Sequence, residues 1–401
     1  MRIFTSMTNI PEISCGFLVA DDLANLTYLT PEKVQAWVDD LNRTTDEELA
    51  GRQLVGAIGT GGTISMKVEN GIRLPDLDFQ GVFSRANSGL NDRFVVKALD
   101  AFQLDSADMD YSHIRDVAIA LTYAWKNLKV SIMGFLIPHG TDTLQYSAAA
   151  TSLIMGQGLP FSVVYTASQK PIQYPMNDAA TNVKNALYTL EALHANNMAE
   201  VVVVMGDYAV LGTSAVKIDD MAANAFDAPL HRYIATFNRM EYPIKLADFL
   251  APARGIPFTP TIWKGDYSHT LVIRSSLGLD PDSIARQLKD KRVQAVIWFA
   301  YGAGTIYQGI GDAMMPIAKE RNIPVFITSP VNTDYKVDYA SGLEMMKQGV
   351  VPLHMTLPSA LAKVEIALRM HAGDVDAMCR FMVSNYVGEV PTEQTRFVPV
   401  R

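Results

Sequence analysis

Short apolar runs alternate with segments of helical periodicity along most of the chain. Seven apolar runs are long enough for buried strands: 54–64, 130–138, 161–167, 200–205, 268–274, 293–299 and 323–327. Seven segments show the apolar spacing or composition of helices: 112–128, 145–155, 178–195, 281–290, 311–321, 338–348 and 358–371. Strands that alternate with helices predict an α/β fold with parallel sheets covered on both faces.

The pattern divides the chain into an extension, two domains and a linker. Within the extension, Thr30-Pro31 is a typical helix start, and apolar residues follow it at helical spacing through Leu41. We expect this helix to dock on the main body or on a neighbouring subunit. Four prolines between 239 and 265 indicate a linker. The predicted organisation is a helical extension at 1–50, an N-terminal domain at 51–240, a linker at 241–266 and a C-terminal domain at 267–401.

Residues 65–92 lack long apolar runs and carry Gly71, Pro75, Gly81 and Gly89. A structureless stretch of this length in a compact chain is often a functional lid or is partly disordered. Because it directly follows the first apolar run, we expect it to form a lid.

The composition is that of a folded globular protein. Of 401 residues, 49% are hydrophobic and 19% are charged, which argues against disorder. The net charge of −8 provides no basic face for nucleic acid. The two cysteines, Cys15 and Cys379, fit neither a disulfide scaffold nor a zinc site. No stretch has the length of a signal-peptide core or a membrane helix, so we expect a cytoplasmic protein. No cluster of His, Cys and Asp has ligand spacing, so we expect neither a metal nor a cofactor.

Two apolar runs end in turns rich in glycine and hydroxyl groups. The first leads into Gly59-Thr60-Gly61-Gly62-Thr63, and the second into His139-Gly140-Thr141-Asp142-Thr143. Open α/β sheets bind ligands at the carboxyl ends of their strands, and glycines leave no side chain in the way. The dinucleotide fingerprint requires glycine at the position of Ile64, and no Gly-Lys-Ser/Thr follows the first turn. Neither nucleotide-binding pattern is therefore matched.

The residue types at these turns suit nucleophilic catalysis. A threonine needs a base beside it to act as a nucleophile. Asp142 lies next to Thr141, and Lys217 lies in an irregular segment after the run at 200–205. An aspartate can hold a lysine ammonium, and burial lowers the pKa of a lysine, so such a pair can relay a proton. Each residue also has a plainer role, because Asp142 could cap a helix and Lys217 could be a solvated surface residue.

The two motifs, in this order and each after a strand, resemble those of the bacterial-type L-asparaginase family. Other segments match in order: Asp105-Ser106-Ala107-Asp108-Met109, Ser168-Gln169-Lys170-Pro171 with Asp178 and Asn182, Gly212 to Lys217, Thr356 to Lys363, and Asn385 with Gly388-Glu389. The chain end resembles the cytosolic, type I branch. The resemblance covers roughly residues 54–390. It implies a flavodoxin-like N-terminal domain, a smaller α/β C-terminal domain, and a homodimer or homotetramer with active sites near subunit interfaces.

The resemblance also implies roles for individual residues. Thr63 takes the role of nucleophile, and Thr141, Asp142 and Lys217 form a second triad that activates a nucleophile or water. Ser106 and Asp142 bind the α-carboxylate and α-amino groups of the substrate. The remaining substrate-binding positions are Gly62, Ala107, Gly140, Thr141 and Thr305. Which threonine acylates first is left open.

The chain departs from the family pattern around the substrate. Residues 65–83 contain no tyrosine, and Ile72-Arg73-Leu74-Pro75 stands where the family's lid tyrosine is expected. Ala107 replaces a residue that contacts substrate, and Thr305 replaces an asparagine that comes from a neighbouring copy of the chain. Ala215-Val216 precedes Lys217 in place of Thr-Thr or Val-Thr. Hydrolysis of an amide is therefore expected to persist, whereas the preference for asparagine is less secure.

These observations favour an amidohydrolase that converts L-asparagine to L-aspartate and ammonia through an acyl-enzyme. The alternatives are a hydrolase of a related amide (L-glutamine, D-asparagine or a non-standard amide) and a non-catalytic small-molecule-binding protein on the same fold. The ammonia-donating component of an archaeal tRNA-dependent amidotransferase is a further relative, but residues 1–50 are too short for the barrel domain of those proteins. The expected partner is a small amide substrate, with no nucleic acid and no membrane.

Overall fold

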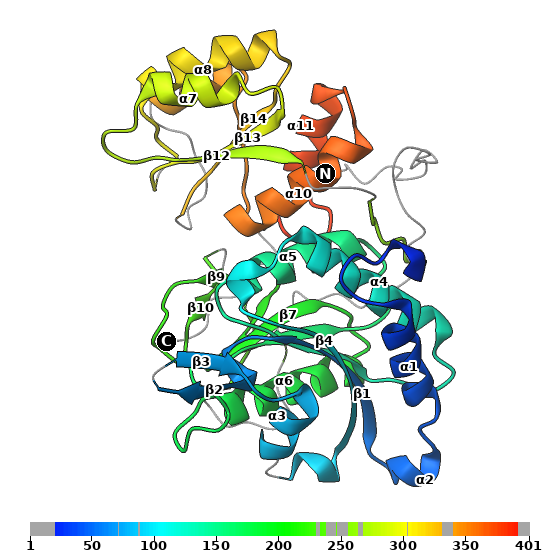
Figure 1. Cartoon of the computed structure of the whole chain (residues 1–401). Helices are drawn as coiled ribbons and strands as arrows, with labels where there is room; N and C mark the ends of the chain where they lie inside the picture. Colours follow the sequence, from blue (N-terminus) through cyan, green and yellow to red (C-terminus); the bar gives the residue numbers. More distant parts are fainter. Residues whose placement is uncertain are drawn as a thin grey trace.

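The computed structural model describes residues 21–70, 72–86, 89–229, 233–237, 246, 256–263, 268–302, 304–330 and 340–391, which form two α/β bodies (Figure 1). Residues 1–20 of the expected extension, with Cys15, lie outside the described residues. So does most of the expected linker. Its longer described part, 256–263, packs on the first body, where Ile262 and Trp263 are buried.

The first body is organised around a seven-stranded sheet. Its strands lie in the order β11 (Tyr233–Thr236), β8 (Tyr208–Leu211), β7 (Val201–Met205), β6 (Val163–Thr166), β5 (Gly134–Pro138), β1 (Gln53–Gly61) and β4 (Phe94–Leu104). The five strands from β7 to β4 are parallel, and β8 and β11 are antiparallel. The parallel strands have the flavodoxin-like order 2-1-3-4-5, which places a ligand-binding crevice between the ends of β1 and β5. The predicted fold class is confirmed.

Helices cover both faces of this sheet. One face carries α1 (Pro31–Asn42), α4 (Tyr111–Asn127) and α5 (Leu144–Met155), and the other carries α3 (Phe79–Ala86) and α6 (Ala179–Ala195) (Figure 1). Side chains of β1 alternate between the two cores, with Leu54 and Ile58 in one and Val55 and Ala57 in the other. A strand buried on both faces explains why its sequence is an apolar run without polar alternation.

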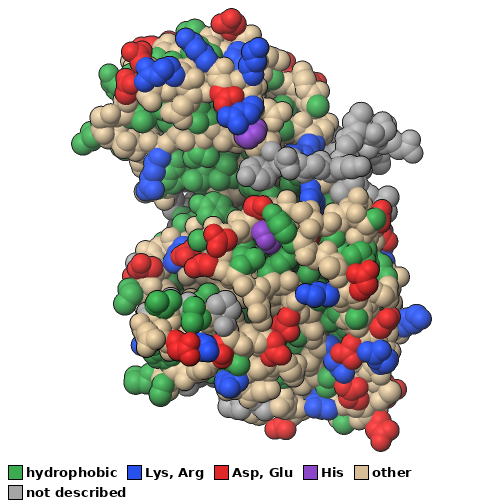
Figure 2. Space-filling model, in the orientation of Figure 1, with side chains coloured by type: hydrophobic (Ala, Val, Ile, Leu, Met, Phe, Trp, Pro, Cys, Tyr) green, Lys and Arg blue, Asp and Glu red, His purple; other side chains and the backbone are tan. Residues whose placement is uncertain are grey.

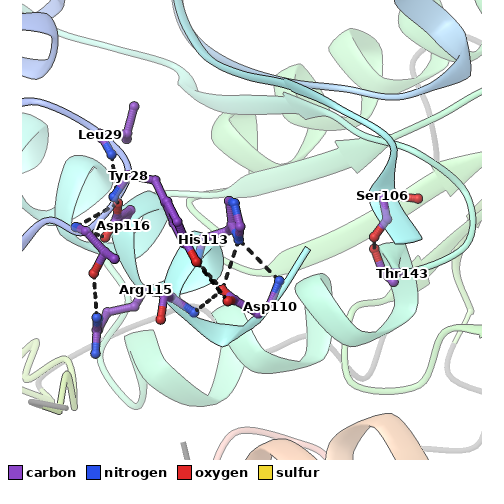
Figure 3. Close-up of polar contacts among 10 residues, drawn as sticks. Tyr28, Leu29, Ser106, Asp110, His113, Arg115, Asp116 and Thr143 are labelled. Atoms are coloured by element: carbon purple, nitrogen blue, oxygen red, sulfur yellow. Dashed lines mark hydrogen bonds and ion pairs between the residues drawn. The ribbon is translucent and has the colours of Figure 1, made fainter. Parts of the chain in front are cut away.

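The described part of the extension docks on its own chain. Thr30 caps α1 by accepting the N–H of Lys33, and the indole of Trp37 donates to the Lys97 carbonyl at 3.0 Å. Ahead of α1, the fully buried Asp116 carboxylate of α4 accepts the backbone N–H groups of residues 27, 28 and 29 (Figure 3). The Tyr28 ring stacks on His113 at 3.9 Å between centroids. A short helix, α2 (Asp46–Leu49), then leads into β1.

The expectation that residues 65–92 form a loop without secondary structure is wrong, and their role as a lid stays a prediction. This stretch forms an antiparallel hairpin of β2 (Met66–Glu69) and β3 (Ile72–Pro75), followed by α3. The signal for α3 is present in the sequence, because Phe79, Val82, Phe83 and Ala86 recur at helical spacing and are all buried. Ile72 projects from the hairpin and is exposed.

The second body is a smaller parallel sheet between two helical layers. The strands lie in the order β12 (His269–Arg274), β13 (Val293–Phe299), β14 (Val325–Thr328) and β15 (Val351–Pro352). Helices α7 (Pro281–Leu288), α8 (Gln308–Glu320) and α9 (Ala340–Lys347) belong to one core, and α10 (Leu357–Met370) and α11 (Val375–Val383) to the other. Helix α10 also packs on α5 and buries Ala362 and Ile366 in the first body's core. Figure 2 shows hydrophobic side chains gathered at this junction.

Candidate active site

The two glycine turns touch each other at the crevice between β1 and β5. Gly62 has φ +81, a conformation that favours glycine. A Cβ atom at Gly62 would lie 2.4 Å from the Gly140 Cα and N atoms, and one at Gly140 would lie 2.5 Å from the Ser106 Oγ. Both positions therefore require glycine, and Gly62, Gly140 and Ser106 form one contact cluster. Thr63 follows Gly62 directly and opens the 3-10 turn Thr63–Ser65.

The lysine of the predicted triad meets the second motif. The Lys217 Nζ donates to the Thr141 Oγ1 at 2.9 Å and to the Asp142 Oδ1 at 2.6 Å. Thr141 is buried and the Lys217 side chain is 15% exposed. Thr141 lies in the turn that follows β5. Lys217 belongs to the two-residue strand β9 (Val216–Lys217), which pairs with β10 (Phe226–Asp227). These contacts and the low exposure argue against the alternative that Lys217 is a solvated surface residue.

Asp142 does not cap the helix that follows it. The N-cap of α5 is Thr143, and no side-chain capping bond is formed there. The Asp142 carboxylate, which is 59% exposed, instead contacts the Lys217 ammonium. Thr143 has a structural task, because its hydroxyl donates to the Ser106 carbonyl at 2.7 Å and holds that residue against the second turn (Figure 3).

The remaining candidates differ in their placement. Ser106 is 3% exposed and begins the 3-10 turn Ser106–Asp108, in which Ala107 is exposed. Thr305 lies in the second body, in the loop between β13 and α8, whereas the two motifs belong to the first body. Thr60 is buried, and its hydroxyl donates to the Pro138 carbonyl at 2.9 Å. This bond joins the ends of β1 and β5 and gives Thr60 a structural role.

His139 stands behind the site as a buried neutral group. It is 1% exposed, its Nδ1 lies 2.8 Å from the Gly140 carbonyl oxygen, and its ring meets Tyr165 edge-on. Burial lowers the pKa of His139 to about 4, although the Gly140 carbonyl opposes this effect. Among the described residues, its Nε2 has no hydrogen-bond partner. The imidazole is therefore uncharged at neutral pH and serves the fold of the turn.

This burial predicts a specific loss of stability in acid. The unfolded chain binds a proton at the ordinary histidine pKa of 6.5, whereas folded His139 binds it at about 4. Neutral His139 therefore contributes its full stability above pH 6.5. This contribution decreases between pH 6.5 and pH 4 and is lost below pH 4, which lowers the free energy of unfolding by about 3 kcal/mol. We expect His139→Leu to show a correspondingly smaller decrease in unfolding free energy between pH 7 and pH 4.5, measured by urea denaturation. Replacing the exposed His194 with leucine is the control, and equal decreases for both variants would contradict the prediction.

A cavity of 280 Å³ lies beside Lys217, at the junction of the two bodies. It is lined by Gln145 and Lys217 from the first body and by Arg274 and Thr356 from the second, among others. Lys217 therefore adjoins the second body, although the two motifs belong to the first. Within the described ranges, no helix is long and apolar enough to span a membrane, and no group of three His, Cys, Asp or Glu side chains could hold a metal ion.

Comparison with known proteins agrees with this architecture. Residues 54–247 match the N-terminal asparaginase family model. The chain is 27% identical to an L-asparaginase of Thermococcus kodakarensis over 339 residues, which cover 83% of this chain and 98% of that protein. It is also 27% identical to the D component of the glutamyl-tRNA(Gln) amidotransferase of Pyrococcus horikoshii, over 86% of this chain and 78% of that component.

Solved structures show the same fold. The thermostable L-asparaginase from Thermococcus kodakarensis superposes with a TM-score of 0.72 at 26% identity, covering 85% of this chain and all of that one. L-asparaginase I from Vibrio cholerae superposes with a TM-score of 0.69 at 23% identity, also over 85% of this chain and all of that one. The fold and the sequence match define an asparaginase-type hydrolase. Residues 54–247 carry the N-terminal domain of the asparaginase family, and the likeness to an L-asparaginase structure extends over 85% of the chain.

Proposed function

We propose that this protein hydrolyses a side-chain amide, with Thr63 as nucleophile and L-asparagine as the first candidate substrate. The observation that carries the proposal is the bonding of the Lys217 Nζ to both the Thr141 hydroxyl and the Asp142 carboxylate. A lysine that donates to a threonine in a partly buried site is a candidate proton acceptor once it is deprotonated. Binding alone does not require this arrangement.

The proposed reaction has two steps. In the first, the Thr63 oxygen bonds to the amide carbon, the C–N bond breaks, and the nitrogen takes a proton and leaves as ammonia. In the second, water attacks the resulting ester, releases the carboxylate product and restores the Thr63 hydroxyl. Thr141, Asp142 and Lys217 accept the proton of the attacking hydroxyl or water and return one to the leaving group. Ser106 and Asp142 are proposed to bind the α-carboxylate and α-amino groups.

Thr305 belongs to the second body, whereas the two motifs belong to the first. We propose, from the resemblance to the family, that the protein is a homodimer or homotetramer and that a neighbouring copy supplies Thr305. The same position, with Ala107 and Ile72, would then set the substrate range. Related amides, namely L-glutamine, D-asparagine or a non-standard amide, are the alternative substrates.

Ammonia release from a panel of amides tests the proposal. The panel contains L-asparagine, D-asparagine, L-glutamine and amides that lack the α-amino or α-carboxylate group, each with wild type and Thr63→Ala. We expect L-asparagine to be hydrolysed by wild type and not detectably by Thr63→Ala. The control is Thr60→Val, which removes the neighbouring hydroxyl of the same motif and is expected to remain active.

The other outcomes are equally informative. Cleavage of a different amide would keep the hydrolase and make Ile72, Ala107 and Thr305 the specificity determinants. Full activity of Thr63→Ala would refute its role as nucleophile. No ammonia from any amide would refute the hydrolase with these substrates. It would favour a binding protein or a component of an amidotransferase, the class that the names of two relatives state.

A further inference from the structure

The proposed catalytic lysine stands on a very short strand outside both main sheets. Strand β9 has two residues and pairs only with β10, also of two residues, in the part of the chain that the structure describes. The Ile218 N–H donates to the Ala225 carbonyl at 2.8 Å. In an antiparallel pair, hydrogen-bonded and non-hydrogen-bonded residue pairs alternate, so the next pair, Lys217 with Phe226, is non-hydrogen-bonded. The backbone N–H of Lys217 therefore points away from β10.

Gln145 provides the acceptor that the strand pair cannot provide. Its side-chain Oε1 accepts the Lys217 N–H at 2.9 Å. Gln145 is the second residue of α5, which follows the motif that contains Thr141 and Asp142. The bond consequently joins the backbone that carries the Lys217 ammonium to the helix that directly follows its two partners.

The segment ahead of Lys217 is held from the other side by the second body. The Thr213 carbonyl accepts the hydroxyls of Thr356 at 3.1 Å and Ser359 at 2.6 Å, both buried at the start of α10. Thr213 is four residues before Lys217, so these two bonds do not fix the backbone of Lys217 directly. The bond from the Lys217 N–H to Gln145 acts on the lysine's own backbone.

We propose that Gln145 is a positioning residue that fixes the backbone of Lys217, so that its ammonium reaches Thr141 and Asp142. The proposal rests on the proposed role of Lys217 in proton transfer. A lysine side chain is long and flexible, and the backbone from which it starts limits where its Nζ atom can lie. Displacement of a catalytic group by about 1 Å can lower a rate about 100-fold.

The test compares three variants with wild type. Gln145→Met has similar length but no oxygen acceptor, Gln145→Glu keeps an oxygen at the same reach, and Tyr146→Phe is the control on the adjacent residue of the same cavity. We expect Gln145→Met to lower kcat about 10- to 100-fold with little change in KM, because the substrate-binding residues are untouched. Tyr146→Phe is expected to stay within a few-fold of wild type. Gln145→Glu is expected to retain more activity than Gln145→Met, although its added negative charge favours the protonated lysine.

Hydrogen exchange gives a readout that does not depend on activity. Peptides that contain residues 216–218, analysed by mass spectrometry, are expected to exchange faster in Gln145→Met than in wild type and to regain protection in Gln145→Glu. Equal exchange in Gln145→Met and wild type would overturn the proposal, and so would unchanged kcat. If wild type releases no ammonia from any amide, the proposed function fails, while the exchange experiment still decides whether Gln145 fixes the lysine strand. Equal thermal unfolding of Gln145→Met and Tyr146→Phe excludes global unfolding as the cause.

Discussion

Lys217→Met is expected to lower kcat for the best amide substrate by about 10²- to 10⁴-fold, the range attributed to a positioned acid or base. Methionine preserves much of the apolar stem of the lysine but removes the ammonium that donates to the Thr141 Oγ1 and the Asp142 Oδ1. Substrate binding through Ser106 remains, so KM is expected to change much less. Initial rates of ammonia release give both constants.

Lys217→Arg separates proton transfer from charge. Arginine keeps a positive charge that can pair with Asp142, but it does not lose its proton near neutral pH. If lysine acts as a base, the arginine variant is expected to be as impaired as the methionine variant. Recovery of activity with arginine would show that Lys217 contributes only its charge. Replacing the exposed Lys184 with methionine controls for the loss of a lysine at a position away from both motifs.

Glu389→Gln is expected to lower the free energy of unfolding by about 3–5 kcal/mol, because it leaves a buried ammonium without its counter-charge. Lys363 on α10 and Glu389 near the chain end are both fully buried, with their charged atoms 2.5 Å apart. The Lys363 Nζ also donates to the carbonyls of Met382 and Ser384 at the end of α11. Burial lowers the pKa of Lys363, and Glu389 opposes that shift. Equilibrium urea denaturation followed by tryptophan fluorescence measures the effect.

A double variant tests whether the damage is electrostatic. Lys363→Met combined with Glu389→Leu removes both charges and is expected to be more stable than either Lys363→Met or Glu389→Leu alone. The backbone N–H groups of Tyr386 and Val387, which donate to Glu389, lose an acceptor in the leucine variant, so recovery is expected to be incomplete. Additive losses in the double variant would refute the ion-pair explanation. Arg292→Met, which breaks an exposed ion pair with Asp290, is expected to leave the free energy of unfolding almost unchanged.

The sequence is informative where the signal is local. Buried strands such as β1 and β5 read as apolar runs, and the glycine turns follow them directly, so the fold class and the neighbourhood of Thr141 and Asp142 can be predicted. Helix α3 is not predicted although its apolar spacing is present. The glycines within 65–92 indicate a loop, and this signal leads to the wrong assignment. Strand β4 is not assigned from sequence, since polar residues such as Lys97 and Asp100 interrupt its apolar pattern at the edge of the sheet.

Other features depend on contacts between distant residues. The bond between Gln145 and Lys217 spans 72 positions, and a two-residue strand such as β9 has too few side chains to show a period. Whether Asp142 caps α5 or binds Lys217 is not decided by the local sequence, which permits both. The bonds from Thr356 and Ser359 to Thr213 likewise exist only because α10 packs on α5.

The contact between Gly62 and Gly140 restricts how this scaffold can be redesigned. Gly140 occupies the space that a side chain at Gly62 would need, and Ser106 occupies the space that a side chain at Gly140 would need. A library that varies either glycine would therefore consist mainly of misfolded turns. Both motifs therefore depend on keeping glycine at these two positions. Diversity is better introduced at Ile72, which is exposed on the hairpin, and at Ala107, which is exposed beside Ser106. A change of substrate by directed evolution is therefore expected to arise from these outer positions while the glycine contact stays invariant.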